Sequence, residues 1–398
     1  MDLSGASAER LGSYLKRIGK LLGNKARRAS FANYALGLLS EAERKSVEPI
    51  AVRMCPDPER ADAEHQRLLH FVGYSTWNDH EVRREAARYG LAAITAHEAV
   101  EAWILDDTGW LKQGVHSVGV QRQYTGSAGK ITNCQIGVSL TIATRTDHLP
   151  IDFSLYLPKP WIQDAVRREI TRVPAQVQFE TKPELGLRMV RQALQDGVPK
   201  GVVLADSGYG SGQDFRAQLR QLGLHYAVGV NSETKVKLIG KSQRVRKEAT
   251  SLRALAMQIK KQGGFRRCTW REGSKEGLWA RFCLRRVWVS KEEQAWLLIE
   301  WRDGEAEPSN YFLSSLPQVK SLKTFVRLVM QRWRIERTYQ DLKGELGLDH
   351  YEGRSFTGWH HHVTVALCCY AFVAAERARL FSPSACGPMQ DGAHRRAA

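Results

Sequence analysis

The sequence predicts a mixed α/β protein in which an all-helical region precedes a mixed five-stranded sheet with flanking helices, and a β-rich segment interrupts this core. Three observations support the prediction. Apolar residues recur at helical spacing up to about residue 95, and alternating β-branched runs follow them. A tryptophan-rich and basic stretch then separates these runs from a last group of helices. With 398 residues, the chain is long enough to build several cores.

Residues 1–95 are expected to form a helical N-terminal domain. Phe31, Tyr34 and Leu38 have the spacing of one helix face, and arginine and glutamate surround them. The segment 55–58 contains two prolines, which divides this region into two groups of helices.

Residues 96–231 are expected to form the first part of the catalytic core. Trp103 begins a short apolar run that ends in acidic residues, and two alternating, β-branched runs, 115–124 and 131–144, come next. Residues 183–197 have helical spacing, and the apolar run 201–205 has the composition of a buried strand. The order predicts three consecutive strands followed by alternating helix and strand.

Residues 232–315 are expected to form a β-rich insertion domain, and residues 316–380 the second part of the core with C-terminal helices. Ser321 is a candidate N-cap for a long helix that runs to Lys343. His360–His362 are consecutive, so on a helix they cannot converge on one ion, and we expect them to face solvent or DNA. The basic tail 381–398 is expected to be disordered.

The charge balance points to a polyanionic partner. Lys and Arg number 59 against 42 Asp and Glu, which gives a net charge of +17. No apolar run is long enough for a membrane span, and no export signal is evident at the start. The seven cysteines show no CxxC pair, which fits a reduced compartment and argues against a zinc site. We therefore expect a cytoplasmic protein, associated with the nucleoid through DNA.

Three carboxylates stand where a phosphodiester-cleaving site would need them. Asp106 and Asp206 each end an apolar strand-like run, and Glu336 lies on a basic predicted helix. Two Mg²⁺ ions held by carboxylates, with Mn²⁺ able to substitute, would activate the attacking hydroxyl and stabilise the leaving oxygen. Asp107 competes with Asp106, because adjacent strand residues face opposite ways and only one of them can point at the metals.

Two cations share the predicted helix face with Glu336. Arg332 and Lys343 lie at offsets that place all three side chains on one stripe, where the cations could hold DNA phosphates. The alternative is a simple Arg–Glu pair on a helix surface, which contributes only a few tenths of a kcal/mol and leaves both aspartates unexplained.

These motifs resemble those of DDE transposases of bacterial insertion sequences, in the group whose third motif reads Tyr-x2-Arg-x3-Glu-x6-Lys. Arg332, Glu336 and Lys343 match, but Val329 stands at the tyrosine position, so Trp333 or Tyr339 would have to supply the aromatic DNA contact. Asp106 with Thr108 fits the first motif, and the run 204–210 around Asp206 fits the second. The resemblance covers roughly residues 70–375 and implies a ribonuclease H-like core.

The resemblance implies cut-and-paste transposition. Such a protein binds double-stranded DNA at transposon ends as a homodimer on paired ends, and the resemblance implies that the N-terminal helices, residues 1–95, form the DNA-binding domain that recognises these ends. It nicks the DNA and joins the freed 3′ ends to target DNA. The resemblance leaves open whether a hairpin intermediate forms. The sequence does not choose which insertion tryptophan, if any, stacks on a flipped base. Two alternatives stay open: a catalytically inactive DNA-binding protein derived from a transposase, and a metal-dependent nuclease without strand transfer.

Overall fold

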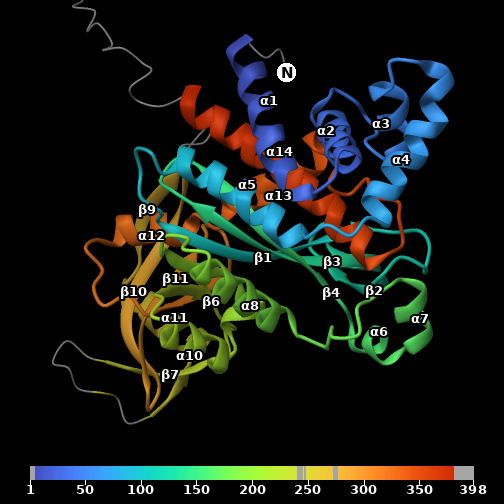
Figure 1. Cartoon of the computed structure of the whole chain (residues 1–398). Coiled ribbons are helices and arrows are strands. Elements are labelled where there is room, and N and C mark those ends of the chain that lie inside the picture. The colour runs from blue at the N-terminus through green and yellow to red at the C-terminus, as the bar shows by residue number, and fades with distance from the viewer. Residues whose placement is uncertain (1–4, 240–244, 246–247, 272–276, 381–398) are drawn as a thin grey trace, which may run out of the picture.

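The computed structural model describes residues 5–239, 245, 248–271 and 277–380 (Figure 1). The expected basic tail at 381–398 lies outside these residues. The chain begins with helices, as the apolar spacing predicts: α1 (Gly5–Gly19), α2 (Lys25–Leu39), α3 (Val47–Met54), α4 (Ala61–Gly73) and α5 (Asp79–Ile94). Within the described part of the chain, no helix is both long and apolar enough to cross a bilayer.

The central sheet begins with four consecutive strands, one more than the three that the sequence predicts. Its first strands are β1 (Ala102–Leu111), β2 (Gln121–Thr125), β3 (Lys130–Ala143), β4 (His148–Tyr156), β5 (Val202–Ala205) and β6 (Tyr226–Gly229). β1 pairs antiparallel with β3 and β3 with β4, whereas β1, β5 and β6 run parallel. The resulting order β4-β3-β1-β5-β6 makes a mixed sheet and is consistent with a ribonuclease H-like fold.

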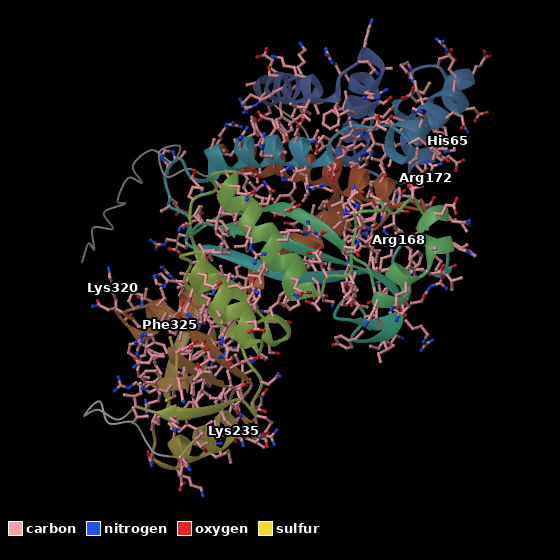
Figure 2. The ribbon with its side chains drawn as sticks, turned by 60° about the horizontal axis from the view of Figure 1, so that its bottom comes forward. His65, Arg168, Arg172, Lys235, Lys320 and Phe325 are labelled. Carbon is pink, nitrogen blue, oxygen red and sulfur yellow. The ribbon has the colours of Figure 1, made fainter. Side chains whose placement is uncertain are left out.

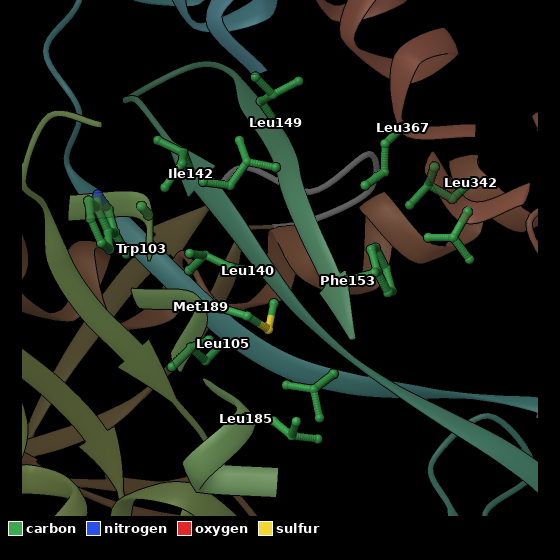
Figure 3. Packing of buried hydrophobic residues seen from close by; sticks show 14 of the residues in the cluster. Trp103, Leu105, Leu140, Ile142, Leu149, Phe153, Leu185, Met189, Leu342 and Leu367 are labelled. Atoms are coloured by element: carbon green, nitrogen blue, oxygen red, sulfur yellow. The ribbon is translucent and has the colours of Figure 1, made fainter. Parts of the chain in front are cut away.

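Five helices lie between the strands of this sheet in the chain, and α8 packs on β3 and β4. They are α6 (Lys159–Gln163), α7 (Ala165–Ile170), α8 (Lys182–Gln195), α9 (Ser207–Gly210) and α10 (Gln213–Gln221). Leu105 and Leu140 face Leu185 and Met189 of α8, and all four are buried in the larger hydrophobic core (Figure 3). α8 fits closely because Gly186 has no side chain; a Cβ there would lie 3.2 Å from Leu105.

The β-rich segment extends the central sheet instead of forming a separate one. It contains β7 (Lys235–Leu238), β8 (Thr250–Ser251), α11 (Leu252–Lys261), β9 (Arg266–Arg271), β10 (Leu278–Ser290), β11 (Glu293–Trp301) and β12 (Asn310–Ser314). β12 pairs with β6, so among the described residues the expected five strands belong to a single 12-stranded sheet. The strands of the core and the strands of the insertion therefore belong to one continuous sheet.

The prediction of a single helix from Ser321 to Lys343 is wrong, although Ser321 does cap the helix that begins there. The segment divides into α12 (Leu322–Met330), α13 (Trp333–Gln340) and a π-helical turn, η3 (Asp341–Glu345). The break follows from a tight turn in which the amides of Gln331 and Arg334 bond to carbonyls three residues back. Arg332 and Lys343 nevertheless both reach β1, whereas Glu336 between them is exposed.

The last helix, α14 (Phe356–Leu380), is mostly buried between the N-terminal helices and the sheet (Figure 1). Our expectation that the histidines at its start face solvent or DNA is wrong for His361 and His362, which are buried. His362 Nδ1 lies 2.9 Å from the Tyr34 hydroxyl, and its Nε2 lies 3.1 Å from two carbonyl oxygens, so Nε2 carries the proton.

The burial of His362 predicts acid sensitivity. Burial lowers its pKa to about 4, so the histidine supports the fold above its unfolded pKa near 6.5 and this stability is lost as pH falls towards 4. Between pH 7 and pH 5, the free energy of unfolding of His362→Gln should fall by about 2 kcal/mol less than that of the wild type. Chemical denaturation at both pH values checks this, with exposed His97→Gln as control. Equal losses in wild type and His362→Gln would contradict the burial argument.

Candidate active site

The two aspartates that the sequence singles out lie next to each other because of strand register. β1 and β5 are parallel, with Ile104 opposite Leu204, and both of these residues belong to the core under α12. Side chains alternate along a strand, so Asp106 and Asp206, two positions further on, project from that same face. Burial is the main cause that raises the pKa of Asp106, and the charge of Asp206 adds to the rise, as expected for carboxylates on adjacent strands.

Asp206 is held by the turn that follows β5. It is the N-cap of α9, and its Oδ1 accepts a hydrogen bond of 2.9 Å from the amide of Gly208. The turn packs directly on the end of β6, where a Cβ at Gly210 would lie 2.2 Å from the Gly229 carbonyl oxygen. Gly210 is therefore required by close backbone approach.

Asp106 and Asp107 point to opposite faces of β1 and have different partners. Asp106 accepts a 2.5 Å hydrogen bond from Arg332, whereas Asp107 forms a 2.8 Å ion pair with Lys182 on the other face. Asp106 is thus the one on the face of Asp206 and α13. This arrangement favours Asp106 over Asp107 as the metal-binding residue.

The environment of Asp106 disfavours its negative charge. Burial is the main cause that raises its pKa to about 7; Arg332 opposes the rise, and the charges of Asp206 and Asp107 add to it. A bound cation would relieve the same repulsion. The crowding of carboxylates with hard oxygen donors therefore fits Mg²⁺.

Glu336 lies on the helix that faces these aspartates. α13 is anchored to β1 and β3 at both ends, by Arg332 to Asp106 and by a 2.6 Å contact between the hydroxyls of Tyr339 and Ser139. Glu336, one helical turn from each anchor, is exposed and makes no hydrogen bond or ion pair within the described residues. Across the described ranges, no group of three acidic, histidine or cysteine side chains is close enough to hold a metal. The structure brings Asp106 and Asp206 together and leaves Glu336 outside.

The remaining predicted DNA contacts are placed differently from one another. Lys343 is half-buried, and its ammonium bonds to the Gly109 carbonyl of β1 at 2.6 Å. Tyr339 is turned inward to Ser139, whereas Trp333 is half-buried at the start of α13. Val329, at the position of the motif tyrosine, is a buried residue of α12.

Two residues near the aspartates had no role in the sequence analysis. Tyr209 lies inside the second motif and places its hydroxyl 3.4 Å from Asp107. Lys182, the partner of Asp107, is 75 residues away in the chain and belongs to no motif. Of these two residues, only Tyr209 could have been found from the sequence, because it lies inside the second motif.

Comparison with known proteins identifies a family that matches this chain. The family described as DDE superfamily endonuclease matches residues 17–277, a span that includes Asp106 and Asp206 and ends before Glu336. A curated protein of Microchaete diplosiphon, named a probable transposase for insertion sequence element IS701, is 28% identical over 211 residues. These residues are 53% of this chain and 50% of that protein, so the chain spans about half the length of the relative.

Proposed function

The chain belongs to the DDE superfamily of endonucleases, and from this we propose that it is a transposase that cuts DNA at transposon ends and joins the 3′ ends to target DNA. The observation that carries the proposal is the pairing of Asp106 with Asp206 on one face of a mixed sheet. The strand order β4-β3-β1-β5-β6 supports a ribonuclease H-like core for this chemistry. The name of the relative supports transposition over other uses of the fold.

In the proposed site Asp106, Asp206 and Glu336 would hold two Mg²⁺ ions, with Mn²⁺ able to substitute. The ions would supply a nucleophilic hydroxyl and neutralise the leaving 3′ oxygen. Asp206 is held by its own turn, and Asp106 is held by β1. Glu336 has no competing partner among the described residues, so its side chain is free to join them. Arg332, which forms an ion pair with Asp106 in this arrangement, would be placed to contact the reacting phosphate.

DNA binding draws on basic side chains over a wide area. Figure 2 shows Arg172 just after α7, Lys235 on β7 and Lys320 before α12, on separate parts of the surface. Such a distribution suits a long duplex whose phosphates are neutralised at several points. We infer that the helices of residues 1–95 recognise the transposon ends. Residues 232–315 act as the insertion, and residues 316–380 act as the second part of the core. A homodimer in the cytoplasm pairs two transposon ends.

A strand-transfer assay tests the proposal. A labelled duplex that carries the inverted repeat flanking the gene is incubated with the protein, Mg²⁺ and a supercoiled plasmid. We expect a nick at the repeat end and label joined to the plasmid, with both products absent in EDTA and joining absent for a 3′-dideoxy end. Cleavage without joining would instead identify a nuclease. Binding without cleavage would identify an inactive DNA-binding protein.

A further inference from the structure

Asp107 occupies a contact network behind the candidate metal site. One carboxylate oxygen pairs with Lys182 at 2.8 Å, and the other accepts a hydrogen bond from the Tyr209 hydroxyl at 3.4 Å. The amide of Asp107 also donates to the Asp106 carboxylate at 2.8 Å. Asp107 is therefore in contact with both Asp106 and the turn that begins at Asp206.

The lysine of this network is fixed by its place in α8. Lys182 is the first residue of that helix, whose start is closed by a capping box between Thr181 and Glu184. The Lys182 ammonium also lies 6.0 Å from the Tyr156 ring on β4. Because a capping box fixes the first turn, the ammonium is presented to Asp107 from a rigid helix end.

The tyrosine connects the network to the second aspartate. Tyr209 is buried, and it belongs to α9, the short helix that Asp206 itself caps. Gly186 of α8 lies against both Leu105 and Tyr209, where a Cβ would be 3.5 Å from the tyrosine ring. The ring is thus clamped between α8 and β1, and a shift of Asp107 would be transmitted to the Asp206 turn.

We propose that Asp107, Lys182 and Tyr209 form a brace that fixes the spacing of Asp106 and Asp206, and that Asp107 is a positioning residue and not a metal ligand. The brace rests on the proposed function, since it concerns the same metal site. Lys182 neutralises Asp107 and keeps its carboxylate on the reverse face of β1. Residues that orient metal ligands in this way typically contribute about 10–100-fold to metal affinity.

Binding of Mn²⁺ without DNA tests the brace independently of catalysis. The signal of free Mn²⁺ in electron paramagnetic resonance is followed as protein is added. We expect Tyr209→Phe and Lys182→Met to weaken binding by about 10–100-fold. Lys182→Arg should restore most of the affinity because it keeps the charge. Lys159→Met, an exposed lysine on α6, serves as the matched control and should bind as the wild type does.

The outcomes separate the brace from the site that it serves. The brace would be overturned if both Tyr209→Phe and Lys182→Met bind Mn²⁺ with wild-type affinity. It would also be overturned if Asp107→Asn loses all Mn²⁺ binding, as Asp206→Ala does. A Lys182→Met variant that changes only the salt dependence of DNA binding would also overturn it, by making Lys182 a DNA contact. If the wild type and Asp206→Ala bind Mn²⁺ equally, the proposed metal site itself fails.

Discussion

Alanine at Asp206 is expected to lower the rate of Mg²⁺-dependent nicking by at least about 10³-fold, because the metal stabilisation of the transition state, worth several kcal/mol, is lost. Asp106→Ala should have an effect of the same size. The double variant should be no slower than either single variant, since both aspartates serve one metal site and their effects are not additive. Single-turnover nicking of an end-bearing duplex measures all three rates.

The controls for this prediction come from the same region of the chain. Asp214 is exposed at the start of α10, eight residues beyond Asp206, and Asp214→Ala should nick within about twofold of the wild type because the residue lies outside the site. Each inactive variant should still bind end DNA. Nicking by Asp206→Ala at the wild-type rate would remove the basis of the proposed function.

The variant Glu336→Gln, measured in the same assay, tests whether Glu336 is the third carboxylate of the metal site. The substitution keeps the size of the side chain and removes its charge. If Glu336 binds a metal, the nicking rate should therefore decrease about as much as in Asp206→Ala. Unchanged nicking would show that another acidic residue completes the site.

Glutamine at Glu293 is expected to lower the free energy of unfolding by about 3–5 kcal/mol, because the charge of Arg216 is left buried without its counterion. The side chains of Arg216 and Glu293 are 3% and 0% exposed and form two hydrogen bonds, of 2.7 and 3.0 Å. Burial opposes ionisation of Glu293, yet the hydrogen bonds from Arg216 and Tyr226 bring its pKa below the usual value. Urea denaturation measures the difference.

A surface pair provides the comparison. Arg281 and Asp303 are 58% and 61% exposed and lie 3.4 Å apart, so Asp303→Asn should change the free energy of unfolding by less than about 1 kcal/mol. Arg216→Met combined with Glu293→Leu should recover much of the loss, because no charge is then buried. A loss from Glu293→Gln no larger than that from Asp303→Asn would contradict the buried-pair argument.

The same pair links stability to the active site. Arg216 also donates a 2.6 Å hydrogen bond to the Gly210 carbonyl, in the turn that begins at Asp206. Glu293 lies on β11 of the insertion, 77 residues along the chain from Arg216, so this strand supports the turn that begins at Asp206. We therefore expect Glu293→Gln to slow nicking as well as to lower stability.

The sequence by itself determined most kinds of elements, their order and the position of Asp206 at the end of β5, whereas the expectation that Asp106 ends its strand is wrong, because β1 continues to Leu111. These features depend on local alternation, turns and caps, which are encoded within a few residues; the cap at Ser321 is one example. The resemblance to DDE transposases rested on short motifs of the same local kind, and the family match confirms it.

Only the tertiary structure decided which aspartate faces Asp206, because this depends on the register of β1 against β5, strands about 100 residues apart. The same holds for the Lys182 partner of Asp107, for the break before α13, and for the burial of His361 and His362. Each depends on a surface supplied by another part of the chain, which no local pattern encodes.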